Sequence, residues 1–291
     1  MSKPTVPAAD ALLGREYRVL DKGFVRLVDY LGGDARIVQS ARVSYQDGTK
    51  TVREDAALID YLVRHKHTSP LEQVVLTFHL KMPIFVARQW LRHRTARLNE
   101  ISGRYSVMRD EFYLPEAAEV RRQSVVNKQG RSDEEVPAAL QERTLNLLKA
   151  GQAEAYAGYQ ELLDEDVARE LARINLPLSL YTEMYWQIDL HNLFHFLRLR
   201  LDAHAQFEIR AYAEVMAELA RAVAPLAYAA FEEHILYAKT FSRSELGVLL
   251  AALDRGALEK ALATSDLRKT RQRELLDKLE AVEMQKLEAA G

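Results

Sequence analysis

The run VVLTFHLKMPIFVARQWLRHR, residues 74–94, joins a strand pattern directly to a helix pattern. Apolar residues alternate with other residues over 74–82, which is typical of a half-buried strand. Pro83 then opens a helical pattern, and proline is well tolerated in the first turn of a helix. We expect this helix to end near Thr95, so that the arginines of the run lie at a helix C-terminus and in the loop after it.

The rest of the chain alternates between short strand patterns and longer helical ones. Residues 16–31 predict two short strands, or a strand and a short helix, separated at Lys22-Gly23. Helical spacing is found over 34–45, 52–65, 190–201 and 206–224, while 178–188 is a candidate strand. Residues 116–140 are polar and predict a mobile excursion, and the chain turns mostly helical from about 137.

Composition limits the class of protein. The chain has 291 residues, 48% of them hydrophobic, which suffices for a sizeable core. A net charge of only -2 argues against a dedicated nucleic-acid binder. The absence of cysteine excludes disulfides, iron–sulfur clusters, Cys-ligated zinc and thiolate nucleophiles. No run is long and apolar enough for a bilayer span or a signal peptide, so we expect a cytoplasmic protein.

Four arginines gather around one carboxylate in RHRTARLNEISGRYS, residues 92–106, where Glu100 is the only acid. Such crowding contributes little to stability, because like charges repel and surface ion pairs are weak. A fork of guanidinium donors suits a phosphate or carboxylate ligand. The alternative interpretation is a solvated, Arg-rich turn.

Two histidine pairs invite a metal interpretation that the sequence does not favour. His65 and His67 lie two apart in HKHTSPLEQ without the ligand spacing of known zinc motifs, so a polar loop that faces a ligand is preferred over a metal site or a plain turn. His191 and His195 share a helix face, but the arginines at 198 and 200 would repel a cation. This helix suits an anionic or aromatic ligand, with an Arg200–Asp202 ion pair as the plain alternative.

Two further patterns carry less weight. Arg173, taken alone, predicts a surface pair with Glu170. A hydrolase with Ser102 as nucleophile and His93 as base is disfavoured, since the G-x-S-x-G elbow is missing and no acid is evidently placed to orient the histidine.

The sequence resembles the flavin-dependent thymidylate synthases. Their signature is Arg-His-Arg, seven residues, then Ser, found here as Arg92-His93-Arg94, TARLNEI and Ser102. The likeness runs from about residue 20 to about 236 and includes ARVSY, HTSPLEQ, ARINLPLSLYT and LRLRLDAHAQFEI. Arg97 stands where the family commonly has Ser, and the helix 190–200 differs from some relatives at Asp189, His191 and His195.

The resemblance implies an α+β fold with a mixed sheet, flanking helices and a mostly helical second half, assembled as a homotetramer whose sites are shared between subunits. The N-terminal sequence predicts a disordered segment 1–15 before the synthase domain 16–240, and the leucine spacing after Ser242 predicts a helical extension 241–291 that the family core does not need. The implied reaction is methylation of dUMP to dTMP, with methylenetetrahydrofolate as one-carbon donor, FAD as cofactor and NADPH as reductant, and no metal. No nucleic-acid or membrane partner is implied.

The resemblance also implies site residues. Arg200 is the implied catalytic residue, because a guanidinium at the O2 and N3 edge of uracil would stabilise developing negative charge. The implied nucleotide contacts are Gln89, Trp90, Leu91, Arg92, Glu100, Ile101, Ser102, Gly103, Arg104, Arg173 and Arg200. The implied flavin contacts are His67, Ser69, Arg92, His93, Arg94, Glu100, Asp189, His191 and His195.

Two alternatives to an enzyme stay open on the sequence. One is a non-catalytic nucleotide-binding module that uses the arginine cluster for phosphate alone. The other is an RNA-binding protein that uses RHRTAR, which the overall charge and the lack of interleaved exposed aromatics disfavour.

Overall fold

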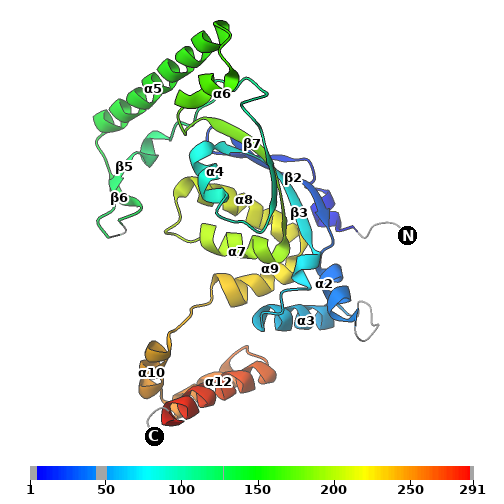
Figure 1. Cartoon of the computed structure of the whole chain (residues 1–291). Helices are drawn as coiled ribbons and strands as arrows, with labels where there is room; N and C mark the ends of the chain where they lie inside the picture. The colour runs from blue at the N-terminus through cyan, green and yellow to red at the C-terminus, as the bar shows by residue number, and fades with distance from the viewer. Residues whose placement is uncertain (1–4, 44–50, 127, 289–291) are drawn as a thin grey trace. The chain divides into compact units, whose positions relative to one another are not determined.

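The computed structural model describes residues 5–43, 51–126 and 128–288. Contacts divide the chain into two compact units, residues 1–237 and 238–291. The first unit contains a five-stranded sheet in the order β1-β2-β3-β7-β4. Its strands are β1 (Glu16–Val19), β2 (Gly23–Leu31), β3 (Val75–Pro83), β4 (Arg97–Glu100) and β7 (Tyr181–Asp189) (Figure 1).

The alternation predicted for residues 74–82 is confirmed in β3. Leu76, Phe78 and Leu80 are fully buried, while Thr77 and His79 between them are partly exposed. The candidate strand at 178–188 is confirmed as β7, which lies beside β3 with Phe78 opposite Trp186. The strand–turn–strand interpretation of residues 16–31 is likewise confirmed by β1 and β2.

The sheet is antiparallel in every described pair, so the mixed sheet predicted above is wrong. The reason lies at the end of β3. The backbone N–H of Ile84 donates to the carbonyl of Leu180 over 2.9 Å, so the chain returns to β7 at the edge where it left β3. A chain that re-enters the sheet beside the end of the strand it has just left must run antiparallel to that strand.

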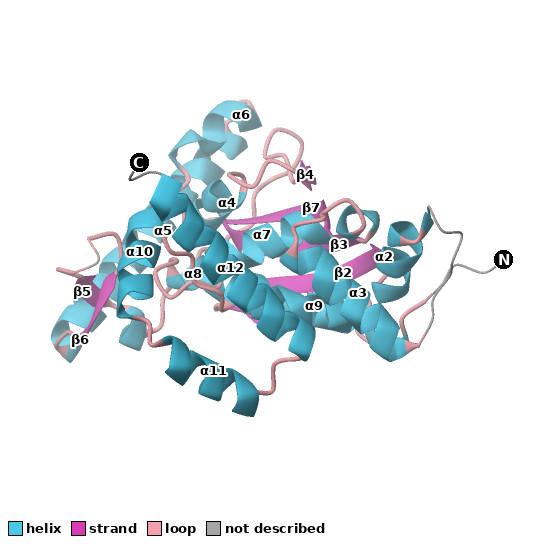
Figure 2. Cartoon of the chain, turned by 90° about the horizontal axis from the view of Figure 1, so that it is seen from below, coloured by secondary structure: helices cyan, strands magenta, loops and turns pink. Residues whose placement is uncertain are grey.

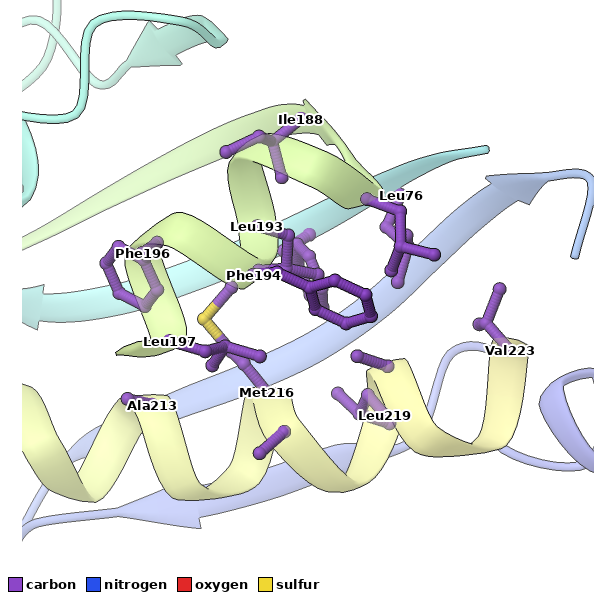
Figure 3. Close-up of a cluster of buried hydrophobic side chains, with 14 of the residues drawn as sticks. Leu76, Ile188, Leu193, Phe194, Phe196, Leu197, Ala213, Met216, Leu219 and Val223 are labelled. Carbon is purple, nitrogen blue, oxygen red and sulfur yellow. The ribbon is translucent and has the colours of Figure 1, made fainter. Parts of the chain in front are cut away.

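Two helices cover the face of the sheet to which Leu76 and Ile188 belong: α7 (Leu190–Arg200) and α8 (Phe207–Val223). Figure 3 shows their apolar side chains meeting those of β3 and β7, with Phe194 and Met216 between the layers. Both of these side chains are 1% exposed or less. This packing fixes the end of α7 against the short helix α4 (Ile84–Trp90), whose Trp90 contacts Phe196 of α7.

Three sequence expectations differ from the structure. Helix α4 ends at Trp90 rather than near Thr95, because the chain turns there to pair β4 with β7. Residues 116–140, predicted as a mobile excursion, include a paired hairpin of β5 (Arg121–Gln123) and β6 (Arg131–Glu135) that was not foreseen. The start of the chain, expected to be disordered, contains α1 (Pro7–Asp10), whose Ala9 is buried.

The remaining elements of the first unit surround this frame (Figures 1 and 2). The helical patterns at 34–45 and 52–65 form α2 (Asp34–Ala41) and α3 (Val52–Arg64), and residues 44–45 lie outside the described part. The others are η2 (Leu71–Gln73), η3 (Ala117–Glu119), α5 (Ala138–Asp164), α6 (Arg169–Ala172), η4 (Arg173–Asn175), α9 (Pro225–Phe231) and the π-helical turn η5 (Glu232–Leu236).

The second unit is helical, as its spacing predicts. It consists of α10 (Arg243–Ala252), α11 (Arg255–Thr264) and α12 (Lys269–Glu288). Ser242 and Glu245 form a capping box at the start of α10, which fixes where that helix begins. In the described part of the chain, no helix combines the length and apolarity needed to cross a membrane.

Candidate functional site

The ends of α4 and α7 meet at Arg200. Its Nε donates to Nε2 of His93 over 3.0 Å, and its Nη2 donates to the backbone carbonyl of Gln89 over 3.2 Å. Two predicted site segments more than a hundred residues apart therefore form one cluster. We call Gln89, Arg92, His93 and Arg200 the α7 group.

The α7 group holds positive charge without a counter-ion. Both partners of Arg200 are neutral acceptors, and burial lowers the pKa of its guanidinium. Within the described ranges, no carboxylate forms an ion pair with Arg200, Arg92 or Arg94. Partly buried charge is costly unless it is paired, so this group is suited to an anionic ligand. The Arg200–Asp202 ion pair weighed above is not what holds Arg200 in place.

His93 is the neutral member of the group. Burial, the nearby charge of Arg200 and His195 together lower the pKa of His93 to about 4. Its Nε2 accepts the hydrogen bond from Arg200, so the ring proton is on Nδ1. An imidazole that stays uncharged can orient Arg200 without repelling it.

This depressed pKa predicts a pH dependence of stability. In the unfolded chain His93 gains its proton near pH 6.5, whereas in the folded chain it does so near pH 4. The unfolded state therefore binds more protons in this window, and the free energy of unfolding decreases as the pH falls through it. We expect the melting temperature to drop on acidification from about pH 7 to about pH 5, and to drop less in His93→Gln. Equal drops in both proteins would contradict this.

A cavity of about 320 Å³ brings together three of the predicted flavin contacts. His67 comes from the loop after α3, while His191 and His195 come from successive turns of α7. Arg198 and Thr68 also belong to the polar part of the wall, and Phe194 and Leu71 to the apolar part. His191 and His195, whose spacing suggested a metal pair, thus line a larger cavity that has both apolar and cationic side chains in its wall.

The backbone at the end of α3 determines where His67 lies. Its N–H donates to the carbonyl of Leu62 over 2.9 Å, and the N–H of Lys66 donates to Val63. This is a Schellman ending, in which Lys66 takes the left-handed conformation at φ 59° that glycine usually adopts. A lysine there costs about 1 kcal/mol, and such strained positions are concentrated at functional sites.

A second group of predicted residues lies on the loop after β4 and on α6 and η4. We call Ser102, Gly103, Arg104 and Arg173 the α6 group. Gly103 is buried, and a Cβ added to it would lie 3.0 Å from Cδ of Arg173, so the two are in close contact. Glu170 pairs over 2.9 Å with Arg104, and the predicted surface pair with Arg173 is not formed.

The ion pair with Glu170 leaves the Arg104 guanidinium accessible to a ligand. Both side chains are at least half exposed, and exposed ion pairs contribute little to stability. Ser102 accepts a hydrogen bond from the backbone N–H of Arg104 over 3.3 Å, whereas His93 bonds to Arg200, so the disfavoured Ser–His pairing is not formed. The α6 group therefore offers a hydroxyl and two guanidinium groups.

Among the described residues, no hydrogen bond or ion pair joins the two groups. The α7 group is built on the ends of α4 and α7, and the α6 group on the loop after β4 and on η4. Glu100 belongs to neither group. Its carboxylate accepts a hydrogen bond from the hydroxyl of Thr182 over 2.6 Å.

Several predicted contacts have another explanation in the structure. The Trp90 side chain is fully buried, so the predicted nucleotide contact cannot apply to its ring. Asp189 caps α7, and both of its carboxylate oxygens accept from Asn192. Leu91 and Ile101 are exposed side chains, as is Ser69 in the loop after α3.

Arg97, the departure from the family pattern, points away from the core. This exposed residue of β4 lies opposite Gln187 of β7 and donates to the Gln187 side chain over a long 3.4 Å. We therefore expect Arg97→Ser to leave the activity within about twofold of the unchanged protein. The measurement is the steady-state rate at saturating substrate. A large loss of activity would mean that Arg97 reaches a ligand.

The sequence analysis missed the side chain that contacts Gln89. The amide of Gln89 bonds to Gln206, which in turn bonds to the buried Glu208 over 2.8 Å. The only sequence signal is that both residues fall in the stretch LRLRLDAHAQFEI, directly before an apolar helix. Contacts between segments this far apart are not visible in spacing.

Comparison with known proteins agrees with the resemblance. The family described as "Thymidylate synthase complementing protein" matches residues 26–226. A flavin-dependent thymidylate synthase of Treponema denticola is 66% identical over 253 residues, which are 86% of this chain and 95% of that protein. Its counterpart in Thermus thermophilus is 59% identical over 261 residues, covering 90% of this chain and 94% of that protein.

A solved structure has the same fold. The UMP/dUMP methylase PolB of Streptomyces cacaoi, bound with 5-Br dUMP, superposes with a TM-score of 0.68 and 32% identity. The match covers 76% of this chain and 99% of that one. With the family profile spanning most of the chain and relatives of this identity, the chain belongs to the flavin-dependent thymidylate synthase family.

Proposed function

We propose that this chain methylates dUMP at C5 to give dTMP, with FAD as its cofactor, methylenetetrahydrofolate as the one-carbon donor and NADPH as the reductant. The observation that carries the proposal is the α7 group, in which Arg200 is held by two neutral acceptors and lacks a carboxylate partner in the described part of the chain. The lack of cysteine supports it, because attack on the uracil ring by a thiolate is impossible here.

Arg200 is the proposed catalytic residue. Two of its N–H groups are taken by His93 and Gln89, which leaves other donors of the guanidinium for the O2 and N3 edge of the pyrimidine. Negative charge that develops as N3 loses its proton would be stabilised there, and this raises the electron density at C5. The neutral His93 keeps the guanidinium oriented without adding a competing charge.

The α6 group is the proposed binding site for the phosphate. Arg104 and Arg173 would bind the dianion with Ser102, and Gly103, which has no Cβ, lets the Arg173 side chain lie directly against this loop. Since no hydrogen bond or ion pair joins the α6 and α7 groups among the described residues of one chain, we propose a homotetramer in which neighbouring subunits complete each site. The catalytic arginine would then come from one chain and the phosphate ligands from another.

The residues present fit a bound FAD. Its pyrophosphate needs cations, and Arg92 and Arg94 are exposed without an ion-pair partner among the described residues. Its rings need a partly apolar cavity, and the wall with His67, His191 and His195 also contains Phe194. When bound, FAD supplies the hydride chemistry, while the protein supplies position and electrostatics.

A non-catalytic nucleotide-binding module is not favoured, given relatives of 66% identity named as synthases. The test is direct. Purified protein should be yellow, should oxidise its reduced flavin on mixing with dUMP and methylenetetrahydrofolate, and should yield dTMP with NADPH as reductant. Colourless protein that takes up no FAD, or flavin oxidation without dTMP, would overturn the proposal.

A further inference from the structure

A buried carboxylate, Glu208, is connected to Gln89 of the α7 group through the side chain of Gln206. Glu208 is 1% exposed and lies in the first turn of α8, where the helix dipole favours negative charge. It accepts hydrogen bonds from the hydroxyl of Tyr113 over 3.0 Å, from Gln206 over 2.8 Å and from the guanidinium of Arg131. A charge this deep must be fully compensated, and these three donors provide that.

This carboxylate fixes the direction of a hydrogen-bond relay. Arg131 is a cation with donors only, and the Glu208 carboxylate that it contacts acts as an acceptor. Gln206 must therefore direct its NH₂ group to Glu208, which leaves its Oε1 to accept from Nε2 of Gln89. One N–H of Gln89 Nε2 is directed at Gln206, which fixes the orientation of the amide, and Oε1 is the acceptor that it presents to a ligand.

We propose that Gln206 and Glu208 are positioning residues that orient the amide of Gln89, so that its Oε1 accepts a hydrogen bond from the nucleotide. The inference rests on the proposed function, which places Gln89 at the nucleotide. The matching ligand group is a donor, either the 3′-hydroxyl of the deoxyribose or the N3–H of the pyrimidine. Gln89 also accepts from Arg200 through its backbone carbonyl, so the relay and the catalytic residue share one anchor.

The same carboxylate also holds the β5–β6 hairpin. Arg131 of β6 bonds to Glu208 and to Glu119 and lies over the ring of Phe207, 5.6 Å from its centroid. Loss of Glu208 would disturb this hairpin as well as the relay. The decisive variant is therefore Gln206→Met, which removes the relay at an exposed residue and leaves the ion pair intact.

The control is Tyr113→Phe. Like Gln206→Met, this variant removes one hydrogen bond to the Glu208 carboxylate. Tyr113, however, is not part of the relay to Gln89. In flavin-loaded full-length protein, we expect Gln206→Met to raise the dissociation constant of dUMP about fivefold, the effect of one hydrogen bond. The flavin content should be unchanged. Tyr113→Phe should bind dUMP as the unchanged protein does.

Two nucleotide analogues locate the donor. One lacks the 3′-hydroxyl and the other carries a methyl group on N3. The fivefold penalty of Gln206→Met should vanish with whichever analogue lacks the donor that Gln89 accepts from, and a penalty that persists with both would overturn the inference.

The inference is also overturned if Gln206→Met binds dUMP normally, or if Tyr113→Phe shows an equal loss. The unchanged protein, measured in parallel, separates the two claims: if it binds dUMP and makes dTMP, the proposed function stands whatever the relay variants do.

Discussion

Replacing Arg200 by Ala should lower the rate of dTMP formation at least a hundredfold, which is about the effect of removing one donor aimed at developing charge. The flavin content should stay close to that of the unchanged protein, because the cavity with His67, His191 and His195 does not include Arg200. The measurements are the steady-state rate with saturating dUMP and the flavin absorbance of the purified variant.

Arg200→Lys is the matched control. It keeps the positive charge, but an ammonium group has no planar fork to bond His93 and the Gln89 carbonyl together while also facing a pyrimidine edge. We expect Lys to recover little of the lost turnover. If Arg200→Ala forms dTMP at the unchanged rate, or if it loses its flavin in proportion to its activity, Arg200 is not the group that activates the pyrimidine.

The frame of the fold could be predicted from local patterns. β3 has apolar side chains at every second position, β7 does so from Met184 to Ile188, and α8 has a wide apolar face, so their burial follows from sequence. β4 could not be found in this way. Its four residues, RLNE, contain one apolar side chain, and only pairing with the edge of β7 makes it a strand.

The candidate site could be predicted in residue types but not in contacts. Crowded arginines indicated an anion site, yet nothing local indicated that Arg200 would bond to His93, or that Gln206 would bond to Gln89. Trp90 is a predicted site residue whose burial could not be read from its neighbours in sequence. It lies within a run of site residues, but its indole packs against Trp186 and Phe196 in the core.

The proposal that each site is shared between subunits makes a second large effect testable. Arg200→Ala and Arg104→Ala should each be nearly inactive alone, the first lacking the catalytic group and the second a phosphate ligand. Co-expressed in equal amounts, they should regain activity, because a site that takes Arg200 from one subunit and Arg104 from another is intact in about a quarter of random combinations. The measurement is the dTMP rate of the purified mixed oligomer.

The matched control carries both substitutions on one chain and is co-expressed with the unchanged protein. Shared sites predict about a quarter of the full activity here too, since the two arginines must again come from different chains. Sites contained within one chain predict about half of the full activity for this control and none for the mixture of single variants. Because both mixtures contain the same substitutions in the same amounts, an inactive mixture of single variants beside a half-active control would rule out a site shared between subunits.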